Sequence, residues 1–162
     1  MIVVVDLLQV LQGATYLAFI AGAIFAVAEL RDYRRERQME IMMRVAEHVN
    51  TREFQDALYK LAKANTKDAL ELEKQVSAVD LNMIATYFEH VGWLGMARIV
   101  SREMIVMFYP WQFFWQKLQP WIETERKEFD VAVMYGSIEK MARLSEAYWE
   151  RKGVLASPRK SP

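Results

Sequence analysis

The first thirty residues constrain this chain most, because no charged residue lies between Asp6 and Glu29. As an α-helix with a rise of ~1.5 Å per residue, the uncharged stretch 7–28 would be about 33 Å long. The hydrocarbon core of a bilayer is about 30 Å thick. The pattern therefore predicts a transmembrane helix over residues 1–30.

Two other kinds of segment share this composition, a cleaved signal peptide and a buried core helix. A secretory signal begins with positively charged residues, whereas Asp6 is the only charged residue before the apolar run. A core helix of a soluble protein carries a polar stripe, whereas the second half of this stretch is apolar all round. Both features favour a membrane span.

Arginines follow the apolar run at once, at Arg31, Arg34, Arg35 and Arg37. Positive charge collects on the cytoplasmic side of a span, so we expect the N-terminus outside and the rest of the chain in the cytoplasm. The same arginines would contact anionic lipid headgroups, which makes membrane lipid an expected partner.

Small residues recur at four-residue spacing within the span, at Ala14, Ala18, Gly22 and Ala26. They share one helical face, and such faces let two membrane helices approach closely. The stripe predicts an integral membrane protein partner or a second copy of the chain. The alternative is that alanine is simply common in membrane helices.

Composition narrows the function classes. Lys and Arg together number 21, as do Asp and Glu, so no broad positive field favours nucleic acid. The absence of cysteine excludes disulfides, thiolate catalysis and thiolate zinc sites.

The rest of the chain predicts an all-α fold, because helix formers dominate and proline is absent before Pro110. We expect a juxtamembrane helical stalk over 31–49, a cytoplasmic helical domain over 50–152 and a disordered tail over 153–162. Asn50 with Glu53 resembles a capping box, and Ser101 is positioned to start a later helix. Pro110 and Pro120 are expected to bend or break the helices that contain them.

Aromatic side chains cluster between residues 108 and 121, and the candidates for docking are Tyr109, Trp111, Trp115 and Trp121. Tyrosine and tryptophan favour both membrane interfaces and protein interfaces. They are also common in cores, and the uncharged run 104–116 is too short to span a membrane. We favour a core with one or two rings exposed, leaving an interfacial segment and a docking surface as alternatives.

Candidate catalytic residues are scarce. His48 and His90 each follow a glutamate, but adjacent helical residues point about 100° apart and share a metal poorly. Both histidines are expected at the surface, and Glu89 with His90 is the best available acid–base pair. No phosphate-binding loop, dinucleotide turn or nucleophile elbow occurs. The sequence therefore predicts no catalytic, cofactor or metal residues.

Two stretches resemble a known family, YFEHVGWL at 87–94 and WQKLQPWIETER at 115–126. The family is a prokaryotic one of short proteins catalogued only as a domain of unknown function. Its members look like proteins with one N-terminal span followed by a cytoplasmic helical domain. The resemblance implies a single-pass protein of a prokaryotic plasma membrane, and it carries over no active residues.

These features predict a non-catalytic, membrane-anchored interaction protein that serves as an accessory or assembly subunit of a larger membrane complex. A membrane-tethered enzyme and a self-associating, lipid-contacting scaffold are the alternatives.

Overall fold

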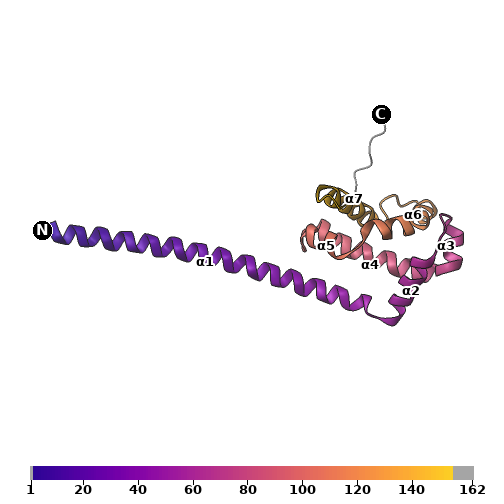
Figure 1. Cartoon of the computed structure of the whole chain (residues 1–162), viewed down its shortest axis with the longest axis horizontal. Coiled ribbons are helices and arrows are strands. Elements are labelled where there is room, and N and C mark those ends of the chain that lie inside the picture. The colour runs from indigo at the N-terminus through magenta and orange to yellow at the C-terminus, as the bar shows by residue number, and fades with distance from the viewer. Residues whose placement is uncertain (1, 155–162) are drawn as a thin grey trace, which may run out of the picture. The chain divides into compact units, whose positions relative to one another are not determined.

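The computed structural model describes the backbone of residues 2–154 and the side chains of residues 12–154. The described residues form seven helices, as predicted for an all-α chain (Figure 1). Their bounds are α1 Ile2–Val49, α2 Arg52–Lys63, α3 Ala69–Val76, α4 Ala78–Met96, α5 Arg102–Phe108, α6 Trp111–Glu128 and α7 Gly136–Arg151. Most of the predicted tail, residues 155–162, lies outside the described part of the chain.

The chain divides into two compact units, residues 1–40 and residues 41–162. The boundary falls within α1, so the second unit begins earlier than the predicted domain start at residue 50. Met42 explains the difference, because it is buried, and Ile41, Val45 and Val49 pack beside it against the same core. The last turns of α1 therefore belong to the helical domain, and only the first part of the predicted stalk lies in the first unit.

Side-chain caps begin four of the shorter helices. Thr51 accepts from the Phe54 amide at the start of α2, so the expected cap at Asn50 is wrong by one residue. Thr51 takes this role because its backbone is extended while its hydroxyl oxygen reaches the third amide beyond it. Asp68 caps α3 in the same way, and Ser101 caps α5 as predicted. At the start of α4 the Ser77 hydroxyl accepts from the Asp80 amide, although Ser77 has a positive φ of 66°.

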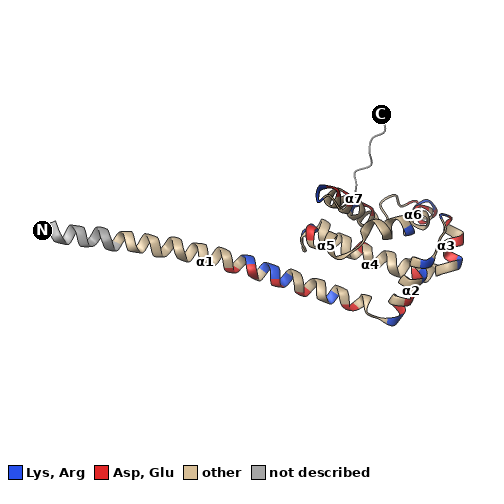
Figure 2. Ribbon diagram, viewed as in Figure 1, with Lys and Arg blue, Asp and Glu red and all other residues tan. Residues whose placement is uncertain are grey.

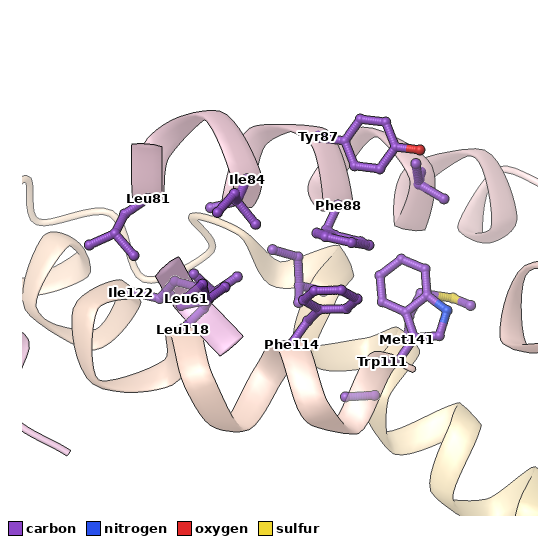
Figure 3. Close-up of a cluster of buried hydrophobic side chains, with 14 of the residues drawn as sticks. Leu61, Leu81, Ile84, Tyr87, Phe88, Trp111, Phe114, Leu118, Ile122 and Met141 are labelled. Atoms are coloured by element: carbon purple, nitrogen blue, oxygen red, sulfur yellow. The ribbon is translucent and has the colours of Figure 1, made fainter. Parts of the chain in front are cut away.

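The core lies between α4 and α6, with α2 and α7 contributing further side chains (Figure 3). Phe88 of α4 is at its centre, stacked on Phe114 at 3.9 Å between ring centroids and edge-on to Trp111 at 5.7 Å. Leu61 of α2 and Met141 of α7 are fully buried in the same cluster. Offset and edge-on pairs of this kind add to the free energy gained from apolar burial.

Two glycines allow α4 to pack closely. A Cβ built on Gly92 would lie 3.0 Å from the Ser137 Cβ and 3.1 Å from the Ser137 carbonyl carbon and oxygen. A Cβ on Gly95 would lie 3.0 Å from Ile105. The glycines therefore set the distance at which α7 and α5 approach α4.

The two prolines have different effects. Pro110 separates α5 from α6, as expected. Pro120 lies inside α6, which continues to Glu128, so it does not break the helix. The buried side chains Leu118, Trp121 and Ile122 hold α6 against the core on both sides of Pro120, which outweighs the one backbone hydrogen bond that proline removes.

Candidate interaction surfaces

The first surface is the exposed part of α1 within the first unit. Every side chain from Gln12 to Arg37 is exposed, including Phe19 at 77% and Phe25 at 76% of the surface each could expose. Among the described residues, α1 is the one helix long and apolar enough to cross a membrane. Membrane anchors and signal sequences share these properties.

The small-residue stripe and the arginines lie on this exposed helix. Ala14, Ala18, Gly22 and Ala26 are all exposed, and a Cβ on Gly22 would meet no atom within 4 Å. Arg31, Arg34, Arg35 and Arg37 are likewise exposed and follow the apolar stretch along α1 (Figure 2). Within the first unit, therefore, neither the small-residue stripe nor the four arginines are covered by other parts of that unit.

The aromatic segment is mainly core. Trp111 is fully buried and donates from Nε1 to the Ile105 carbonyl oxygen at 3.0 Å. Trp121 is 2% exposed and donates from Nε1 to the Glu73 carboxylate at 2.9 Å. The expectation that these two rings are docking residues is therefore corrected, because both rings are buried and hydrogen-bonded inside the domain.

The other two docking candidates are half-buried. The Tyr109 and Tyr87 hydroxyls are 2.9 Å apart, and the Trp115 ring lies 5.8 Å from the Arg126 guanidinium. Phe108 and Phe113 of the same segment are exposed, as the expectation of one or two exposed rings requires. Helical spacing distinguishes the two groups, since the buried side chains recur along one face of α6, at Trp111, Phe114, Leu118, Trp121 and Ile122.

Sequence reasoning missed a groove between the end of α1 and α4, both within the second unit. It has a volume of about 470 Å³, in the range of small-molecule sites. Arg44, Val45 and His48 line one side, and the α4 residues Tyr87, His90, Val91, Trp93 and Leu94 line the other. The two histidines, expected at the surface and exposed as predicted, thus share one groove.

Tyr87 joins the two walls of this groove. Its hydroxyl donates to the Val45 carbonyl oxygen at 3.2 Å and pairs with the Tyr109 hydroxyl. Burial, followed by the hydrogen bond with Tyr109, raises the pKa of Tyr87 well above its ordinary value. Tyr87 therefore stays protonated, and its hydroxyl keeps donating the hydrogen bond to Val45 that joins the last turns of α1 to α4.

Glu89 faces a different neighbour from His90. Its carboxylate accepts from the Ser137 amide at 2.9 Å and from the Ile138 amide at 3.2 Å, at the start of α7. A carboxylate at a helix N-terminus satisfies unpaired amides and opposes the helix dipole. The proposed acid–base pair is therefore divided, with Glu89 capping α7 and His90 lining the groove.

No group of three or more His, Asp or Glu side chains among the described residues is arranged to hold a metal ion.

Comparison with known proteins supports the resemblance in the sequence. No curated protein and no solved structure shows significant similarity to this chain. The profile of one family, described as a domain of unknown function (DUF4760), matches residues 16–145. This match covers most of the chain, including the second half of the apolar stretch and nearly all of the helical domain. The chain therefore belongs to the DUF4760 family.

Proposed function

We propose that this chain is a non-catalytic, membrane-anchored interaction protein of a prokaryotic plasma membrane, and that it serves as an accessory or assembly subunit of a larger membrane complex. The observation that carries the proposal is the exposure of large apolar side chains along α1. Each Leu, Ile, Phe or Val contributes roughly −0.3 to −0.6 kcal/mol to membrane insertion. Lipid is the solvent that suits such a surface.

The arginines after the apolar stretch support a cytoplasmic helical domain and contact with lipid headgroups. Because the chain contains no cysteine, single introduced cysteines can test this orientation. Val3→Cys should react with a membrane-impermeant maleimide in intact cells. Lys140→Cys on α7 should react only after permeabilisation. The opposite pattern would contradict the orientation.

The small-residue stripe supports a partner helix within the membrane. Ala18→Leu with Gly22→Leu would place two bulky side chains on that face, so the complex extracted in mild detergent should become smaller. Gly13→Leu with Ala23→Leu adds the same bulk at positions at least about 100° around the helix from both Ala18 and Gly22, and it should leave the complex unchanged. Equal effects of the two pairs would reject the stripe as a contact face.

The partner itself can be identified by purifying the full chain in mild detergent and analysing what accompanies it. An integral membrane protein present in fixed proportion, and lost with the Ala18→Leu and Gly22→Leu pair, is the expected result. Recovery of the chain alone as a stable monomer would contradict the proposed accessory role.

A further inference from the structure

The groove between α1 and α4 has an apolar floor. Tyr87 and Val91 are buried beneath it, while Val45 and Leu94 are half-buried at its sides. The Tyr87 hydroxyl is already engaged with Val45 and Tyr109, so the ring rather than the hydroxyl is available to a ligand. The floor therefore suits a hydrocarbon body.

The rim of the groove is basic. Arg44, His48 and His90 are exposed lining residues, and the lining includes no Asp or Glu. Arg44 and His48 are one helical turn apart on α1, so they share a face. Glu89, the acidic neighbour of His90, is held at the start of α7. The rim therefore offers N–H donors suited to a negatively charged group.

We propose that this groove binds a long-chain carboxylate. The hydrocarbon chain lies over Tyr87, Val91 and Leu94, with the exposed indole of Trp93 beside it. The carboxylate accepts hydrogen bonds from the imidazoles of His48 and His90, a charge-assisted arrangement. An apolar lining with a few polar groups at one edge is typical of a small-molecule site. The proposal does not depend on which protein, if any, contacts α1.

Photo-crosslinking tests this assignment on the full chain in phosphatidylcholine nanodiscs. The probe is palmitic acid carrying a diazirine in its chain, and the comparison probe is the corresponding alcohol. We expect adducts of the acid at residues 44–48 and 87–94, displaced by unlabelled palmitate. Labelling by the alcohol should be about tenfold weaker, because one charge-assisted hydrogen bond is worth that factor or more.

Glutamates introduced at the rim provide the matched variants. His48→Glu with His90→Glu should reduce labelling of the groove by the acid about tenfold or more. Asn65→Glu with Ala147→Glu adds the same charge at exposed positions outside the groove and should leave labelling unchanged. All four positions are exposed, so the substitutions spare the core.

Three results would overturn the assignment: equal labelling by the alcohol, labelling that persists after His48→Glu with His90→Glu, or adducts of the acid confined to residues 12–28. The last of these would place the probe in the bilayer beside α1. It would therefore support the proposed membrane span while rejecting the groove as a carboxylate site.

Discussion

Phe19 of α1 and Phe88 of α4 are the same residue type in opposite surroundings. Phe19 is 77% exposed, whereas Phe88 is 1% exposed and makes four close contacts with aromatic rings, those of Tyr87, Tyr109, Trp111 and Phe114. The helical domain buries its own apolar side chains, while the first unit leaves its apolar side chains to an external solvent. The comparison teaches that apolar residues in this chain have two different fates, burial in a packed core in one unit and exposure along a helix in the other.

The largest expected effect separates these purposes directly. Phe88→Ala should destabilise the helical domain by about 3–5 kcal/mol, because it leaves a cavity among buried rings. Phe19→Ala should change the stability of the domain by less than about 0.5 kcal/mol. Denaturant unfolding followed by near-ultraviolet circular dichroism measures both. Similar losses in the two variants would mean that the apolar part of α1 also packs into the core of the domain.

Gly92 in the helical domain and Gly22 in the first unit extend the same comparison. Gly92→Ala should cost about 1–3 kcal/mol, because its Cβ would press on the backbone of Ser137. Gly22→Ala should leave the stability of the domain unchanged, since the space around Gly22 is open. The free energy of unfolding from urea titration of both variants checks this. A neutral Gly92→Ala would show that α7 can move away from α4 at little cost.

A smaller loss of stability is expected when Glu89 is replaced. Glu89→Ala removes the acceptor for the Ser137 and Ile138 amides, and loss of such a cap costs about 0.5–2 kcal/mol. Hydrogen exchange should accelerate in the first turn of α7. His90→Ala is the matched control, because His90 is exposed and its loss should leave exchange in α7 unaltered. Acceleration in both variants would contradict the cap.

The smallest expected effect concerns pH. Burial, followed by the charges of Glu128 and Glu73, raises the pKa of Glu125 above its ordinary value. The stability associated with this raised pKa is complete below the unfolded-state pKa and is lost as pH rises through the folded-state pKa. Glu125→Gln should therefore be slightly more stable than the parent at neutral pH. The difference should disappear in acid, and urea midpoints across that pH range measure it.

Local patterns predicted much of this fold. The long apolar stretch predicted α1, and Ser101 marked the start of α5. These features depend on residues close together in the chain. Thr51, rather than Asn50, caps α2 because the choice between adjacent residues depends on backbone angles that composition does not reveal.

The groove could not be predicted in this way. It requires His48 and His90, far apart in the chain, to lie on facing helices, and Tyr87 to bond the Val45 carbonyl. No local periodicity specifies which helices face each other. Both histidines follow a glutamate in the sequence, but only tertiary packing brings the two histidines together and turns Glu89 toward α7.

The central claim is that lipid surrounds the apolar part of α1, and cysteine accessibility in native membranes tests it most directly. Single cysteines at Leu17, Ile20 and Ile24 should resist a water-soluble maleimide, while Lys140→Cys in opened membranes should react rapidly. The account would be contradicted if the intact protein stayed in the aqueous fraction and the four single-cysteine variants reacted at similar rates.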